Sequence, residues 1–158
     1  MAKLRITKLP RHAHTHAYGG VDALPTNSIG RAQIQPLGVF HVGTASPAPG
    51  TGGAYGVAVT ITPVAGKSLV PLAAKLEWGG TFATGETVSI RITAVYNDGT
   101  SVSIERSATA AGSINLNSAD LSPLYADGKY IVRLDVDSSS SATATSVTTS
   151  AAIYSLEI

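Results

Sequence analysis

Residues 88–104 read Val88-Ser-Ile-Arg-Ile-Thr-Ala-Val-Tyr-Asn-Asp-Gly-Thr-Ser-Val-Ser-Ile104. Apolar and polar residues alternate on both sides of the Asn-Asp-Gly triplet, which is the pattern of two half-buried strands joined by a tight turn. Gly99 can adopt the left-handed backbone conformation that the last position of a three-residue turn requires. We therefore predict an antiparallel hairpin that turns at residues 97–99.

The length of this turn decides which side chains face one another across the hairpin. A three-residue turn places Ile92 opposite Ile104. It also places Ala94 opposite Val102, so that apolar side chains share one face. A two-residue turn would instead place Ile92 opposite Glu105 and bury a charged group. Because a slip of one residue moves every side chain to the other face of the sheet, the three-residue turn is predicted.

Further strands are predicted on both sides of the hairpin, separated by turns rich in Gly and Pro. They cover residues 38–43, 54–62, 73–78, 112–117 and 129–137, and a last strand ends the chain. The side chains expected to share a face are Tyr55, Val57, Val59 and Ile61, then Tyr130, Val132, Leu134 and Val136, and finally Ala152, Tyr154, Leu156 and Ile158. Roughly seven or eight short strands without a convincing helix predict an all-β fold, an antiparallel β-sandwich of the jelly-roll or immunoglobulin-like type.

The composition favours a thin aliphatic core and a surface suited to contact with other subunits. Hydrophobic residues make up 44% of the 158 residues, but aromatic residues make up only 6%. Charged residues make up 13%, well below the roughly 25% that is usual for soluble domains. Cysteine is absent from the sequence, which excludes disulfide bonds and thiolate metal sites.

The first part of the chain differs from the rest in composition and charge. Residues 1–36 contain several Pro and Gly residues and no amphipathic helix pattern, so they are predicted to be an extended arm that precedes a β-sandwich domain at 37–158. Residues 1–31 hold five basic residues and one acidic residue, whereas the remainder of the chain holds six basic and nine acidic residues. This asymmetry favours contact between one subunit's arm and another subunit's body; the alternative is a solvated basic tail. Five scattered cations are too few to indicate nucleic-acid binding.

The arm is expected to bind a partner through its larger side chains. Residues 4–9 alternate apolar and polar residues, as in a short strand that adds to the sheet edge of another molecule. The expected contact residues are Leu4, Ile6, Leu9, Arg11, Tyr18, Asp22, Leu24, Ile29 and Ile34.

Three alternating histidines suggest a metal site in the arm. In an extended chain His12, His14 and His16 project to one side. A His-x-His pair is suited to a transition metal, and three chains around an axis would complete the ligand shell. The alternative is that these residues are polar spacers in a loop. His41 lies in an apolar strand and is expected to be a packed or edge histidine.

Motifs for catalysis are not evident in the sequence, and the chain is not expected to be an enzyme. It contains no nucleophile elbow, phosphate-binding loop or zinc-protease motif. Trp78 and Tyr125 are candidates for contact with a glycan, although packing in the core is the alternative for such aromatic residues. A signal peptide and an apolar run of about 18 residues are also absent, so no contact with a membrane is expected.

Residues 12–34 carry a pattern of the form His-x-x-x-His-x-x-Gly-Gly-x-Asp-x-Leu that leads into a Ser-Ile-Gly turn. The residues concerned are His12, His16, Gly19, Gly20, Asp22, Leu24, Ser28, Ile29 and Gly30. This segment resembles a linker found in tail fibres and related virion proteins of tailed bacteriophages. The resemblance implies a virion surface protein with a β-sandwich head, used for capsid decoration, fibre attachment or receptor contact.

We therefore expect a non-enzymatic structural protein of a virus particle, namely a capsid decoration or cement subunit whose arm docks on neighbouring subunits. It is expected to form a homotrimer and to contact the major capsid protein or tail proteins. Synthesis in the host cytoplasm and a final location on the virion surface follow from this hypothesis. The alternative is a short tail fibre, or an attachment protein that binds a receptor or host glycan.

Overall fold

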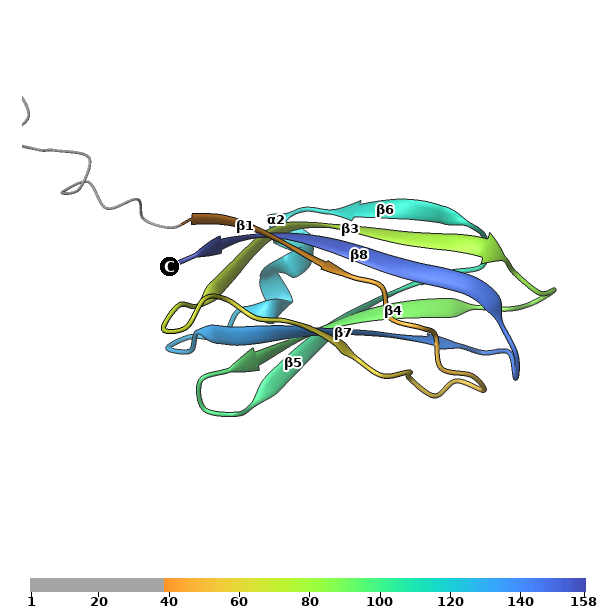
Figure 1. Cartoon of the computed structure of the whole chain (residues 1–158), viewed down its shortest axis with the longest axis horizontal. Coiled ribbons are helices and arrows are strands. Elements are labelled where there is room, and N and C mark those ends of the chain that lie inside the picture. Colours follow the sequence, from red (N-terminus) through yellow and green to blue (C-terminus); the bar gives the residue numbers. More distant parts are fainter. Residues whose placement is uncertain (1–38) are drawn as a thin grey trace, which may run out of the picture. The chain divides into compact units, whose positions relative to one another are not determined.

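The computed structural model describes residues 39–158, which form eight strands and two short helical segments (Figure 1). The strands are β1 (Val39–Ala45), β2 (Val59–Ile61), β3 (Leu69–Thr81), β4 (Val88–Tyr96), β5 (Ser101–Ala108), β6 (Gly112–Leu116), β7 (Ile131–Ser140) and β8 (Ser146–Glu157). The helical segments are α2 (Ser118–Leu121) and the 3-10 turn η1 (Ser122–Leu124). The predicted all-β fold is confirmed.

The strands form two antiparallel layers, with the orders β1-β8-β3-β6 and β2-β7-β4-β5 (Figure 1). A single pairing of Leu69 with Ile131 joins the layers, so that hydrogen bonding connects all eight strands. These two strand orders are those of a jelly roll, one of the two sandwich types that the sequence predicted.

The hairpin of β4 and β5 has the predicted register. Ile92 pairs with Ile104, and Ala94 pairs with Val102. The turn is closed by a hydrogen bond of 2.9 Å from the Tyr96 amide to the Thr100 carbonyl. Gly99 has a φ of 81°, the left-handed conformation for which glycine was expected.

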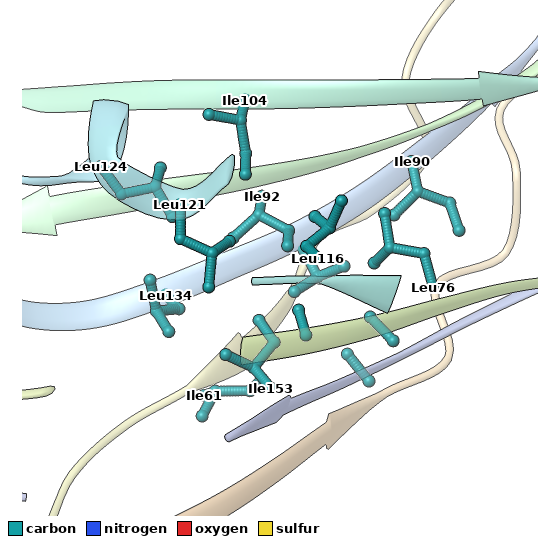
Figure 2. Packing of buried hydrophobic residues seen from close by; sticks show 14 of the residues in the cluster. Ile61, Leu76, Ile90, Ile92, Ile104, Leu116, Leu121, Leu124, Leu134 and Ile153 are labelled. Carbon is teal, nitrogen blue, oxygen red and sulfur yellow. The ribbon is translucent and has the colours of Figure 1, made fainter. Parts of the chain in front are cut away.

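Aliphatic side chains fill the space between the two layers (Figure 2). The fully buried members include Leu76, Ile90, Ile92, Leu134 and Ile153. The helical turn formed by α2 and η1 lies between the two layers (Figure 1) and adds Leu121 and Leu124 to the core.

That helical turn was not predicted, although the sequence contains its signal. The Asn117 side chain accepts hydrogen bonds from the Ala119 and Asp120 amides, and the Asp120 carboxylate accepts one from the Asn117 amide. This is a capping box.

The strand predicted at 54–62 is wrong in length, since β2 contains only Val59–Ile61. Val57 is 88% exposed. The preceding loop lies against the end of β7 instead, where the amides of Gly50 and Gly56 both donate to the Ser138 carbonyl, at 3.0 and 2.8 Å. These hydrogen bonds hold the backbone of residues 50–56 in a path that a regular strand does not follow.

The register predicted for β7 is wrong at its start because of a bulge. Tyr96 pairs with Ile131 while Val95 pairs with Arg133, so Val132 is an extra residue on β7. The bulge turns Ile131 into the core and leaves Tyr130 exposed. At its other end β7 continues to Ser140, beyond the predicted end at 137.

The side chains predicted to share a face of β8 do so, and this face is the outer one. Ala151 and Ile153 point into the core, whereas Tyr154 and Leu156 lie on the outer face and are half-buried. Ile158 is held beside the sheet, because it exchanges two backbone hydrogen bonds with Ser68.

Strand β3 begins earlier than predicted, at Leu69. The sequence prediction began this strand at residue 73, because Pro71 cannot donate a hydrogen bond to a neighbouring strand. The structure accommodates Pro71 at a bulge between Pro71 and Ala73, before the start of the pairing with β6 at Ala74.

A buried carboxylate pins the loop between β3 and β4 to the end of β7. Glu86 accepts hydrogen bonds from the Ser140 hydroxyl at 2.6 Å and the Ala83 amide at 2.7 Å. Hydrogen bonds from Ser140, Thr145 and Ala83 lower the pKa of Glu86. The ionised form therefore stabilises the fold, and this contribution is complete above the pKa of the unfolded chain and is lost as the pH falls through the lower folded value.

The variant Glu86→Gln is expected to be less stable than the unchanged protein near neutral pH, with a smaller loss of stability on acidification below about pH 4.5. The measurement is the free energy of unfolding by denaturant at several pH values between 3 and 7. Ser140→Ala should reduce the same pH dependence, whereas Thr143→Ala in the nearby exposed loop should not. Equal slopes for Glu86→Gln and the unchanged protein would refute this role.

Candidate functional site

Among residues 39–158, β1 is an edge strand without the features that usually protect an edge. Its seven residues, Val39-Phe-His-Val-Gly-Thr-Ala45, include no Lys, Arg, Asp, Glu or Pro. The other edges are different: β2 has three residues, β6 has five, and β5 carries Glu105 and Arg106. An uncharged edge of this length tends to pair with another chain unless something covers it.

The outer face beside this edge is apolar. Phe40 lies next to Leu156 and Val42 next to Tyr154, because β1 and β8 pair in this register. On the other side of β8, Leu156 pairs with Val70 and Tyr154 with Ala73. We call these six residues, Phe40, Val42, Val70, Ala73, Tyr154 and Leu156, the outer apolar face.

Its most exposed members lie on β1. Phe40 is 60% exposed and Val42 is 47% exposed. The centroids of the Phe40 and Tyr154 rings lie 6.2 Å apart. The same layer already buries its inner face in the core. A second apolar face on one layer is typical of a surface that contacts another protein.

An apolar groove lies close to the start of β1. It has a volume of about 770 Å³ and is lined by the loop at 62–68 together with Tyr130, Val132 and Ile158. Glu157 connects the groove to β1, since one carboxylate oxygen lies 3.2 Å from both the His41 Nδ1 and the Val64 amide. His41 is thus an edge histidine, as predicted.

The outer face of the other layer is polar and its charges are paired. Arg91 on β4 forms a two-pronged ion pair with Asp137 on β7, with its Nε 2.9 Å from the carboxylate. The ring of Tyr55 covers the guanidinium at 3.7 Å, and its hydroxyl donates to Glu105. Burial and the neighbouring Glu105 carboxylate raise the pKa of Tyr55 to about 12. This cluster holds the loop before β2 against the sheet. Its charged and polar groups interact with one another.

The predicted glycan contact at Trp78 is wrong. Trp78 is 2% exposed and lies in the core, where its indole nitrogen donates to the Val88 carbonyl at 3.0 Å. Tyr125 is 41% exposed and its hydroxyl donates to the Pro71 carbonyl. The two rings therefore do not form a common exposed platform.

The other predicted site residues lie outside the described part of the chain. These are His12, His14 and His16 and the nine contact residues of the arm. Within residues 39–158, no group of three or more side chains is arranged to hold a metal ion. In the same range, no helix has the length and apolar character needed to cross a membrane.

The outer apolar face was not predicted as a site. Its signal in the sequence was weak: the strands at 38–43 and at the end of the chain carry apolar residues at positions on both faces.

Comparison with known proteins gives only distant structural similarities. No protein-family model and no curated protein matches the chain. Among solved structures, the crystal structure of PirA is 11% identical, with a TM-score of 0.41 over 73% of this chain and 92% of PirA. Two structures of infectious bursal disease virus are also similar. A VP2 subviral particle is 13% identical, with a TM-score of 0.39 over 77% of this chain, and the Gt strain is 17% identical, with a TM-score of 0.37 over 75%. The chain spans 30% of each viral chain. These scores carry no argument about function.

Proposed function

We propose that the chain is a non-enzymatic structural subunit of a virus particle, a capsid decoration or cement protein that docks through β1 and the arm that precedes it. The observation that carries this proposal is the uncharged edge of β1, flanked by the outer apolar face and located where residues 1–38 join the sandwich. Docking there would cover the unpaired edge strand, which is otherwise prone to aggregation, and would bury the apolar surface in the same contact.

The paired charges of the described residues agree with a structural role. The ion pair of Arg91 with Asp137 links β4 to β7, that of Lys129 with Asp98 links two turns, and that of Arg133 with Asp135 lies within β7. The link to a virus comes from the resemblance of residues 12–34 to phage virion linkers. A homotrimer and contacts to major capsid or tail proteins belong to the same proposal, as does a location on the virion surface. A short tail fibre would use the same docking surface, whereas a glycan-binding function loses support because Trp78 is buried.

We expect Phe40→Asp to weaken binding of the full chain to its particle by about ten-fold or more, because it places a charge within an apolar contact. Particles produced without the chain are mixed with purified protein, and the bound fraction is measured by sedimentation at several concentrations. Val57→Asp is the matched control, since Val57 is more exposed than Phe40 and lies outside the outer apolar face. Equal binding of Phe40→Asp and the unchanged protein would contradict the docking surface, and failure of the unchanged protein to bind would contradict the proposed function.

A further inference from the structure

The free side of β1 is open to one additional strand. All seven residues of β1 pair with β8, from Val39 opposite Glu157 to Ala45 opposite Ala151, and among residues 39–158 no strand pairs with its other side. In its second half the Gly43 position faces the core and lies against the Ile61 side chain of the other layer. Its first half is open, with Val39 and Phe40 about equally exposed. The free N–H groups on this side can donate to an extended segment and the free C=O groups can accept from it, so that a ladder of hydrogen bonds forms.

We propose, building on the function proposed above, that residues 4–9 of a second copy of this chain add to the free edge of β1 as an extra strand. The segment Leu4-Arg-Ile-Thr-Lys-Leu9 has nearly the length of β1 and alternates apolar and polar residues at its start. In an added strand, Leu4 and Ile6 project to one face and Arg5 to the other. With the apolar side chains outward they extend the outer apolar face past Phe40 and Val42.

The charges of the two parts favour this contact. The segment itself contributes Arg5 and Lys8, within an arm whose first 31 residues hold five basic residues and one acidic residue. The remainder of the chain holds six basic and nine acidic residues. Because β1 carries no charged residue of its own, the basic segment meets no like charge on the strand it joins. The attraction is long-ranged and weakens with salt.

The intervening sequence favours a second copy over the same molecule. An ordinary hairpin with β1 would use the residues directly before Val39, and these include Pro36, which cannot donate a ladder hydrogen bond. Residues 10–38 separate the segment from β1 and span roughly 90–100 Å when extended, which is enough to reach a neighbouring molecule. On a particle that carries many copies side by side, the neighbour's edge is present at a high effective concentration. Exchange of an identical element is a common route to closed oligomers.

The absence of cysteine from the sequence permits a direct test. One full chain carries Ile6→Cys and a second, distinguished by a mass tag, carries Val42→Cys. The two are mixed, allowed to assemble and treated with a short bis-maleimide cross-linker. We propose the register in which Ile6 lies opposite Val42 on the outer apolar face. Opposite residues on paired strands hold their Cβ atoms roughly 4.5–5.5 Å apart, so we expect at least about ten-fold more mixed dimer than from Ile6→Cys with the control Val57→Cys.

Three results would overturn the inference. They are an equal yield with Val57→Cys, no mixed dimer, or a cross-link that forms only within one molecule when a single chain carries both Ile6→Cys and Val42→Cys. The last result would show that the arm returns to its own β1. The cross-linking test and the particle-binding test can fail independently. A chain that binds particles without forming this cross-link refutes the strand exchange alone. A chain that exchanges strands but does not bind particles refutes the particle function alone.

Discussion

Trp78→Ala is expected to lower the free energy of unfolding by about 3–5 kcal/mol, the range found when large aromatic side chains are removed from cores. Trp78 is almost fully buried, and it also supplies the hydrogen-bond donor for the Val88 carbonyl. A domain of this size has a total stability of roughly 5–15 kcal/mol. The loss should therefore be visible as a large decrease in the denaturant midpoint measured by circular dichroism or fluorescence.

A milder variant keeps this prediction testable if Trp78→Ala does not fold. Trp78→Phe retains most of the apolar volume but leaves the buried Val88 carbonyl without its donor, which costs about 1–3 kcal/mol. Tyr130→Ala is the control, because Tyr130 is exposed and should change stability by less than about 1 kcal/mol. If Trp78→Ala were as stable as Tyr130→Ala, the indole could not lie in the core, and its interpretation as a glycan contact would return.

The hairpin of β4 and β5 could be predicted residue by residue because its determinants are local. The turn at residues 97–99 and the facing pairs Ile92–Ile104 and Ala94–Val102 lie within one short stretch. Only one register keeps charge out of the core. The number of strands and the sandwich architecture followed from the same alternation repeated along the chain.

Features that depend on distant partners could not be predicted from local patterns. The bulge that turns Ile131 inward is defined by the pairing of β7 with β4, a strand about 40 residues earlier in the chain. Tyr154 and Leu156 were expected on a common face, but which face is buried depends on β8 lying between β1 and β3.

The docking surface was missed for the same reason. Phe40 and Val42 become an exposed edge only because the strand order ends at β1. Alternation predicts that a strand exists, whereas an edge is defined by the neighbour that is missing.

Removal of residues 1–36 is expected to abolish binding to particles while leaving the stability of the sandwich almost unchanged. The core residues all lie between Ala45 and Ile153, so the shortened chain keeps every buried apolar contact of the described fold. Docking would lose the arm that contacts the neighbouring subunit, and binding energy gained over many copies would be lost with it. Thermal unfolding monitors the fold, and sedimentation with particles that lack the chain monitors docking.

A second variant separates the strand-forming segment from the rest of the arm. Replacement of residues 4–9 by a Gly-Ser sequence of equal length keeps the connector at 10–38 and its histidines but removes the side chains that would pack beside Phe40. If this variant loses binding as completely as the shortened chain, the arm acts mainly through residues 4–9; if it retains part of the binding, the connector contributes contacts of its own. Full occupancy of particles by the shortened chain would contradict a docking arm, because β1 and the outer apolar face would then be sufficient without it.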